Sequence, residues 1–219
     1  MVLKESNLKN VKAELDSAIS YQIDDRLPAV IHLAESCNYE VEHTNQVTRL
    51  ALCLFDELSS LHNLGPRERF WLQCAALLHD IGWIEGRKDH HKVALKIILS
   101  TPLLPFESKE RLIIGSVARY HRKALPDPRH DNFASLTPEE QQIVRILAAL
   151  LRVADGLDCL HQNRVRDLTC KITKKRVTMV CTVKKVIPNE SLVSLKKADL
   201  FELVFQRELI LVYKKSRHD

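Results

Sequence analysis

Apolar residues recur at helical spacing through roughly the first 160 residues, and this pattern restricts the chain to a mainly helical body. Thr137-Pro138-Glu139-Glu140 marks one helix start, with a capping hydroxyl, a proline in the first turn and acidic side chains at the positive end. Gly65-Pro66 separates two helices, and the proline-containing segment 123–136 is a predicted loop. The expected helices span residues 7–20, 26–37, 41–61, 67–80, 90–100, 108–124 and 138–157.

The pattern changes after Asp158. Residues 165–172 and 176–183 are rich in β-branched side chains and alternate in polarity, which predicts a hairpin. Residues 191–206 are amphipathic at helical spacing, and residues 208–213 predict a closing strand. We therefore expect a mainly α fold, a helical bundle with a small C-terminal ββαβ appendage. Residues 1–160 would form the all-helical domain and residues 161–219 a small basic, β-rich subdomain.

Several classes of protein are excluded by composition. No apolar run approaches the roughly 20 residues that cross a bilayer, and the first residues contain no signal-peptide core, so a cytoplasmic protein without membrane contact is expected. Six cysteines without a CxxC pair indicate reduced core thiols. Residues 160–219 carry 14 Lys and Arg against 6 Asp and Glu. A solvated basic face is the favoured interpretation, and nucleic acid is not an expected partner because no nucleic-acid motif accompanies the charge.

Histidines and aspartates stand on the apolar faces of several predicted helices. His43, His79, His121 and Asp155 each lie one or two turns from apolar residues on one stripe. Asp80 is adjacent to His79, close enough for both side chains to reach one ion. A single histidine on an apolar face is more often a hydrogen-bonded core residue than a ligand. Because buried carboxylates are costly unless they are paired or coordinate a cation, this set predicts a shared divalent metal ion.

At this point the sequence resembles a known family. The order of His43, His79-Asp80 and Asp155 resembles the H…HD…D pattern of the HD-domain metal-dependent phosphohydrolases. The resemblance is closer to the HD-type C-terminal region of the Ppx/GppA (exopolyphosphatase / guanosine pentaphosphate phosphatase) family. It is carried by "YEVEHTNQVTRLALCLFDEL", "CAALLHDIGW", "DHHKVALKIILSTPL", "IGSVARYHRKALP" and "ILAALLRVADGLD". It implies the HD fold and a metal site, but not exopolyphosphatase activity, because the actin-like domains that carry that activity are absent from this sequence.

The resemblance implies two sets of metal ligands. The first ion would be held by His43, His79, Asp80 and Asp155. A second ion would take histidines from the next two helices, which are His91 (or its neighbour His90) and His121, with Asp80 as a bridge. The "HHKHS" common in the closest relatives reads "HHKVA" here, with Val93 in place of the last histidine, so one ion or two stays open. Mixed nitrogen and oxygen ligands suit Mn, Mg, Fe, Co, Ni or Zn.

Basic residues follow the expected ligands. Arg122 and Lys123 come directly after His121, and Arg152 lies one turn before Asp155. Phosphate binding is their functional interpretation, and solvated surface charge is the alternative. His90, if it is not a ligand, is a candidate general acid. The candidate catalytic residues are therefore Asp80, His90, Arg122, Lys123 and Arg152.

Two functions from different classes remain open. The first is a metal-dependent phosphohydrolase that cleaves a phosphate ester or anhydride of a nucleotide or related small molecule with metal-activated water. The second is a non-catalytic regulatory module, or one that binds polyphosphate or another anion. The expected partner is a small phosphorylated substrate or polyphosphate, and a homodimer is left open. Asp158 is expected to end a helix, with support of the metal site as the alternative.

Overall fold

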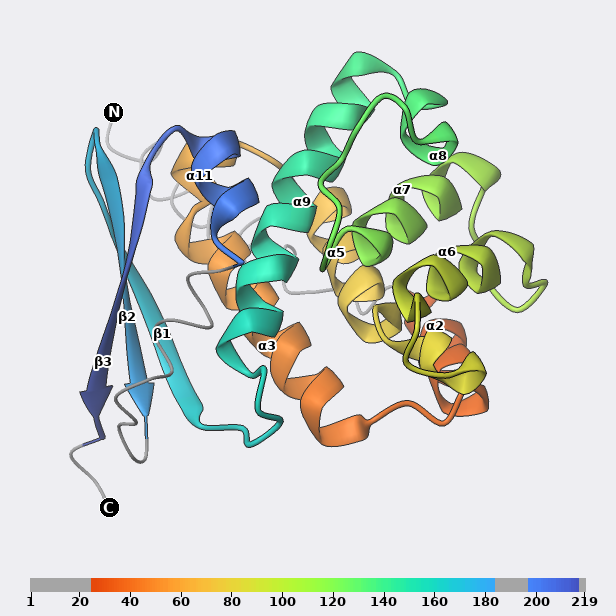
Figure 1. Cartoon of the computed structure of the whole chain (residues 1–219), viewed down its shortest axis with the longest axis horizontal. Helices are drawn as coiled ribbons and strands as arrows, with labels where there is room; N and C mark the ends of the chain where they lie inside the picture. The colour runs from red at the N-terminus through yellow and green to blue at the C-terminus, as the bar shows by residue number, and fades with distance from the viewer. Residues whose placement is uncertain (1–24, 184–196, 217–219) are drawn as a thin grey trace, which may run out of the picture.

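The computed structural model describes residues 25–183 and 197–216 and is mainly helical, with a small C-terminal sheet (Figure 1). This confirms the expected fold class. The helices are α2 (Leu27–Ser36), α3 (Val41–Glu57), α4 (Ser59–His62), α5 (Pro66–Leu78), the 3-10 helix η1 (Ile81–Glu85), α6 (His90–Ser100), α7 (Ser108–Arg119), α8 (Asp131–Ala134), α9 (Pro138–Leu157) and α11 (Asp199–Phe205). The strands are β1 (Val165–Ile172), β2 (Arg176–Val183) and β3 (Glu208–Lys215). The expected helix at 7–20 and residues 191–196 of another lie outside the described residues.

Helix α9 organises the bundle. It packs against α3, α5 and α7 on the helical side and against α11 on the side of the sheet (Figure 1). Its start is fixed by a capping box, in which Thr137 Oγ1 accepts from the N–H of Glu140 at 3.3 Å and Glu140 Oε2 accepts from the N–H of Thr137 at 2.9 Å. Thirteen of its 20 residues are buried, among them Arg152 and Asp155. Polar side chains near its C-terminal end are therefore forced into the interior.

Helix α7 is shorter than the sequence predicted. It ends at Arg119 rather than near residue 124, and Tyr120 closes its last turn. His121 Nδ1 donates to Ala118 O at 2.6 Å, which turns the ring back under the helix end. Lys123 then takes a left-handed backbone conformation with a φ of 54°, so the chain leaves the helical path. The expectation that His121 lies on the helix was wrong, although its side chain is buried.

Helix α3 is also shorter than expected. It ends at Glu57, and a separate short helix, α4, follows in place of a continuous helix to residue 61. His62 stabilises the interruption between α3 and α4. Its Nε2 donates to Phe55 O at 2.8 Å, and its Nδ1 accepts from the N–H of Leu64 at 2.9 Å. Both ring nitrogens are therefore satisfied, and His62 is a structural histidine.

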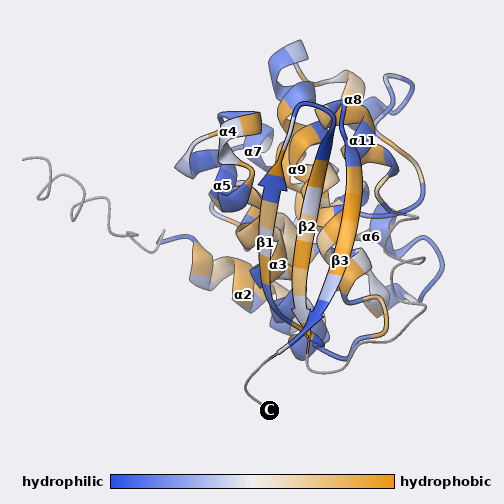
Figure 2. Cartoon of the chain, turned by 90° about the vertical axis from the view of Figure 1, so that its left-hand side faces the viewer, coloured by the Kyte–Doolittle hydropathy of each residue, from blue (hydrophilic) through white to orange (hydrophobic). Residues whose placement is uncertain are grey.

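The sheet has the order β1-β2-β3. β1 and β2 form the predicted antiparallel hairpin, and β3 runs parallel to β2. Along β2, Val177, Met179, Cys181 and Val183 are buried in alternation with more exposed residues. This buried face lies against α3 and α11, and Figure 2 shows the opposite face.

One continuous hydrophobic core joins the helical bundle to the sheet. Leu50, Leu54 and Ala148 from the helices and Leu168, Met179 and Phe201 from the C-terminal part belong to the same cluster. The boundary near residue 160 stays a prediction. Over residues 25–183 and 197–216, no helix combines the length and apolar character that crossing a membrane requires.

Candidate metal centre

Six histidine and aspartate side chains converge at the ends of helices. They are His43 in the first turn of α3, His79 directly after α5, Asp80 directly before η1, His90 at the start of α6, His121 just past α7 and Asp155 in the last turn of α9. All are buried except Asp80, whose side chain is 14% exposed. The last carbonyl groups of a helix lack partners within it, and His79 and His121, which follow α5 and α7, donate to such carbonyls.

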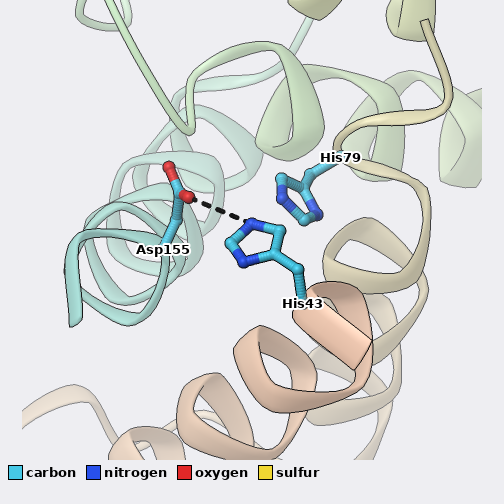
Figure 3. A group of neighbouring side chains, drawn as sticks. All are labelled: His43, His79 and Asp155. Carbon is cyan, nitrogen blue, oxygen red and sulfur yellow. Dashed lines mark ion pairs between the residues drawn. The ribbon is translucent and has the colours of Figure 1, made fainter. Parts of the chain in front are cut away.

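The first group is formed by His43, His79 and Asp155 (Figure 3). One ligand atom from each residue lies within 4.8 Å of the others. His43 Nε2 lies 3.5 Å from Asp155 Oδ1, and the rings of His43 and His79 are 5.5 Å apart at their centroids. The three side chains come from α3, from the residue directly after α5 and from α9, which are distant in sequence, so only the packing of the bundle brings them together.

The second group is formed by Asp80, His90 and His121, again with ligand atoms within 4.8 Å of one another. Asp80 Oδ1 lies 3.1 Å from His90 Nε2 and 3.5 Å from His121 Nε2. Its other oxygen, Oδ2, faces the first group and lies 3.4 Å from His79 Nε2 and 4.0 Å from His43 Nε2. Asp80 therefore stands between the two groups with one carboxylate oxygen toward each.

The four histidine rings share one orientation. Each ring has Nδ1 beside an oxygen outside the centre and points Nε2 toward the aspartates. The Nδ1 partners are Asp158 Oδ2 for His43 (2.9 Å), Ala76 O for His79 (2.7 Å), Arg87 O for His90 (3.0 Å) and Ala118 O for His121 (2.6 Å). Carbonyl and carboxylate oxygens only accept, so Nδ1 carries the ring hydrogen, and a neutral ring presents the Nε2 lone pair to the centre. Metal-binding histidines are oriented in this way.

Unpaired buried atoms test whether a cation fits. Within the described part of the chain, His43 Nε2, His79 Nε2 and Asp80 Oδ1 are buried and have no hydrogen-bond partner. A neutral His90 ring turns a lone pair toward Asp80 Oδ1, so their 3.1 Å contact joins two acceptors. Buried acceptors that face one another are unfavourable unless a positive charge lies between them. The donor set of imidazole nitrogens and carboxylate oxygens therefore fits a divalent transition metal ion.

Electrostatics favour ionised carboxylates. Burial by itself would raise the pKa of Asp80, but the surrounding histidines, His79 foremost, hold that pKa well below its usual range. Burial likewise acts to raise the pKa of Asp155, and Lys197 and His43 outweigh it and keep that pKa low. Both side chains therefore offer charged oxygens to a cation.

The histidines differ between the two groups. Burial, with the electrostatic effect of the neighbouring His79, lowers the pKa of His121 to about 3, so its ring is neutral. Burial also acts to lower the pKa of His43, but contacts with Asp155 and Asp158 outweigh it and raise the pKa to about 9. A proton and a metal ion therefore compete for His43 near neutral pH, whereas His121 is ready to coordinate.

The comparisons with known proteins show the family of this chain. Residues 26–202 match the family model described as Ppx/GppA phosphatase, domain III. The chain belongs to the Ppx/GppA phosphatase family. Within that family it corresponds to the HD-like C-terminal region, as the sequence resemblance predicted.

A curated relative in the same family is the guanosine-5'-triphosphate,3'-diphosphate pyrophosphatase of Pseudoalteromonas atlantica. The two proteins are 28% identical over 147 residues, which make up 67% of this chain and 28% of the relative. The match thus spans less than a third of the relative's length. The buried histidine and aspartate groups lie in the region that matches the family.

In this Ppx/GppA family member, His90 rather than its neighbour His91 belongs to the second group. Of the two alternatives for this ligand, His91 or His90, the structure therefore groups His90 with Asp80 and His121, and the roles of ligand and general acid stay predictions. His91 is buried, and its ring centroid lies 6.5 Å from that of His121. Burial, with the electrostatic effect of the neighbouring His90, lowers the pKa of His91 to about 4. His90 Nε2, by contrast, lies 3.1 Å from Asp80 Oδ1.

Arg152 does not face the aspartates of the centre. Its guanidinium forms three contacts of 2.9 to 3.1 Å with the carboxylate of Asp199, and NH1 donates to Tyr120 O at 3.1 Å. Its side chain is only 4% exposed. These contacts occupy most of the five N–H donors of an arginine, so the expected phosphate-binding role gives way to a structural one that joins α9 to α11.

Arg122 and Lys123 lie beside the second group. Arg122 NH1 lies 3.3 Å from His90 Nε2, so the guanidinium touches a member of that group. Lys123 is exposed, and its Nζ lies 3.4 Å from Asp89 Oδ1. The structure therefore puts two positive charges at the edge of the centre, close to His90.

The contacts of His161 and Lys197 with the centre were not predicted from the sequence, and support from Asp158 was only an alternative. Asp158 binds His43 Nδ1 and also accepts from backbone N–H groups after α9, so it both supports the ring and ends the helix. The ring of His161 stacks on that of His43 at 3.7 Å. Lys197, from the C-terminal part, donates to Asp155. His161 and Lys197 carry no local pattern that separates them from ordinary surface residues.

Proposed function

We propose that this chain is a metal-dependent phosphohydrolase that cleaves a phosphate ester or anhydride of a nucleotide or related small molecule. The observation that carries the proposal is the common orientation of four histidine rings, each held through Nδ1 and directing Nε2 toward Asp80 or Asp155. This arrangement is expensive in a protein that binds no cation, because it buries acceptors against acceptors.

The residues that would hold the metal follow from the two groups. His43, His79 and Asp155 would hold one ion, His90 and His121 a second, and Asp80 would contribute one oxygen to each. A divalent ion bound there would supply Lewis-acid chemistry, lowering the pKa of water and withdrawing negative charge from a phosphoryl oxygen. Mn, Mg, Fe, Co, Ni and Zn all suit these donors.

The chain's own residues would bind and orient the substrate. Arg122 touches His90 at the edge of the second group, and a guanidinium can grip a phosphoryl group with two N–H donors. Lys123 would add a second positive charge beside it. Asp158 holds His43 by its Nδ1 and so fixes the direction of Nε2.

The proposal is tested by hydrolysis assays on the metal-free protein reconstituted with manganese, cobalt, magnesium or nickel. The panel would hold nucleoside mono-, di- and triphosphates, guanosine 5'-triphosphate 3'-diphosphate and polyphosphate. Asp80→Asn should lower turnover more than about 100-fold, since losing even a residue that only supports a ligand costs 10–100-fold. Asp127→Asn, which removes a carboxylate outside both groups, is the matched control and should leave turnover unchanged. A reconstituted protein that binds metal yet hydrolyses nothing on the panel would refute the proposal.

A second candidate is a non-catalytic module that binds polyphosphate or another anion. It is favoured by one observation, that Arg122 and Lys123 put two positive charges beside the second group, where they can bind an anion whether or not it is cleaved. Retained metal and tight binding of polyphosphate without turnover would support this candidate over the enzyme.

A further inference from the structure

Two aromatic side chains lie beside the metal centre, one against each group. The ring centroid of Trp83, on η1, lies 5.5 Å from that of His90, a member of the second group. The ring of His161, in the segment after α9, is stacked on that of His43 in the first group, with 3.7 Å between the centroids and 4° between the planes. The centroids of Trp83 and His161 are 6.3 Å apart. This aromatic pair therefore borders both groups.

Both rings of the aromatic pair are held by contacts of their own. His161 Nδ1 donates to Glu40 Oε2 at 2.7 Å, which fixes the direction of the imidazole. Trp83 donates its backbone N–H to Asp80 O at 3.0 Å. The guanidinium of Arg87 lies over the indole of Trp83, 5.1 Å from the ring centroid. Rings that are already oriented lose little conformational freedom when a ligand binds to them.

Trp83 differs from a core tryptophan. Among the described residues, the hydrophobic core includes Trp71, which is 5% exposed and donates its Nε1 hydrogen to Glu110 at 3.1 Å. Trp83 does not belong to that core, is partly exposed, and has no hydrogen-bond partner at Nε1 in this part of the chain. The side chain of His161 is 30% exposed. Core packing therefore does not account for the pair, and an accessible aromatic surface beside a polar site suits a planar ligand.

The histidine that contacts Trp83 also contacts a positive charge. Arg122 NH1 lies 3.3 Å from His90 Nε2, and the Lys123 ammonium lies at the same edge of the centre. A guanidinium that can bind a phosphoryl group and an indole that can stack on a planar ring are thus separated by one imidazole. A nucleotide carries the complementary groups, a phosphoryl group and a base joined by a sugar. Polyphosphate and sugar phosphates offer no ring to Trp83.

We propose that the substrate is a nucleoside phosphate whose base stacks on Trp83 and His161 while its phosphoryl group lies at the metal centre beside Arg122. This inference rests on the proposed function and narrows its substrate class to nucleotides. Trp83 is the residue through which to test it. His161 is less suitable, because its ring is stacked on the expected metal ligand His43 and its removal would disturb the centre itself.

The test compares the hydrolysis of AMP and of ribose 5-phosphate in the presence of Mn²⁺, because these two substrates differ by the base. The KM of the wild type should be about tenfold lower for AMP, since stacking of a base on an aromatic side chain changes affinity by about this factor or more. Trp83→Leu should raise the KM for AMP about tenfold and leave the KM for ribose 5-phosphate unchanged. Trp83→Phe keeps a ring and should retain most of the preference for AMP. Tyr213→Leu, which removes a partly exposed ring from β3, is the matched control and should behave as the wild type.

Fluorescence provides a second measurement, which does not depend on turnover or on the folding of Trp83→Leu. The sequence contains two tryptophans, Trp71 and Trp83. In stopped-flow mixing with Mn²⁺ present, AMP should quench the tryptophan emission of the wild type before hydrolysis begins, and ribose 5-phosphate should not. Trp83→Phe leaves Trp71 as the emitting residue and should show no quenching by AMP.

The outcomes separate this inference from the proposed function. If the wild type hydrolyses both substrates and Trp83→Leu changes both KM values equally, base stacking is overturned and the proposed function stands. If AMP quenches the emission of Trp83 but the protein hydrolyses no phosphate ester, base stacking stands and the proposed function is refuted. If AMP quenches no emission of the wild type, base stacking is overturned whatever the protein hydrolyses.

Discussion

Gly82, the second residue of η1, lies directly against the first turn of α6. A Cβ atom added there would stand 2.0 Å from His90 O and 2.7 Å from the backbone nitrogen of Ala94. An ordinary van der Waals contact needs at least 3.4 Å, so η1 and α6 would have to separate by about 1.4 Å. Both clashing atoms belong to the backbone, and no change of rotamer relieves them.

Gly82→Ala is therefore expected to act on both stability and the metal centre. Overpacking lowers stability by about 1–3 kcal/mol, and a clash between backbone atoms lies at the upper end of that range. Replacing glycine by alanine raises stability by about 0.4–1 kcal/mol, because it lowers the conformational entropy of the unfolded chain. The free energy of unfolding should fall by about 2 kcal/mol, which lowers the melting temperature by about 4–8 °C in a chain of this size. A shift of about 1.4 Å would also carry His90 Nε2, now 3.1 Å from Asp80 Oδ1, out of the second group.

Urea unfolding followed by circular dichroism measures the first effect, and titration with Mn²⁺ measures the second. Gly65→Ala is the control, because the nearest atom to its added Cβ is Glu68 Oε2 at an ordinary 3.5 Å, and its cost at a helix N-cap should stay within about 1 kcal/mol. The reasoning is refuted if Gly82→Ala unfolds within about 0.5 kcal/mol of the wild type and binds Mn²⁺ equally well.

Three other predictions follow from contacts of the described residues. Asp158→Asn removes the carboxylate that holds His43 Nδ1 and should weaken Mn²⁺ binding about 10–100-fold in calorimetry; unchanged affinity would contradict that role. Asp199→Ala leaves the Arg152 guanidinium buried without its carboxylate and should lower the free energy of unfolding by about 3 kcal/mol. Arg152→Met should lower it less, because the Asp199 side chain that it leaves unpaired is 44% exposed and can be hydrated. Urea titrations that give the reverse order would refute this. Burial raises the pKa of Cys181 to about 12, so its thiol should not react with a disulfide reagent at pH 8 until urea is added; rapid labelling of the folded protein at Cys181 would contradict its burial.

Much of the fold was encoded in local sequence patterns. The bounds of α9 (Pro138–Leu157) agree with the prediction because a capping threonine and a proline mark its start and an apolar stripe runs its full length. β1 and β2 agree because alternating β-branched residues on either side of a short basic turn favour a hairpin. The ends of α3 and α7 were missed because side chains of His62 and His121 form hydrogen bonds there that compete with the helix.

The candidate site was predictable to the extent that it depends on burial. Helical periodicity marked His43, His79, His121 and Asp155 as inward-facing, and the structure buries all four. Periodicity could not choose between His90 and His91, because both are buried and their directions depend on how α6 meets η1. The close approach of Gly82 to the backbone of α6 determines how η1 packs against α6, and no local sequence pattern predicts this contact.

The sequence by itself determined a mainly helical chain with a small C-terminal sheet and a set of polar side chains that must lie inside it. Only the tertiary structure decided which of those side chains meet, and that Asp155 is paired with Lys197 and Arg152 with Asp199. The physical reason is that secondary structure and burial follow from neighbours within a few residues, whereas an ion pair joins residues more than 40 positions apart whose partners are set by the packing of α9 against α11.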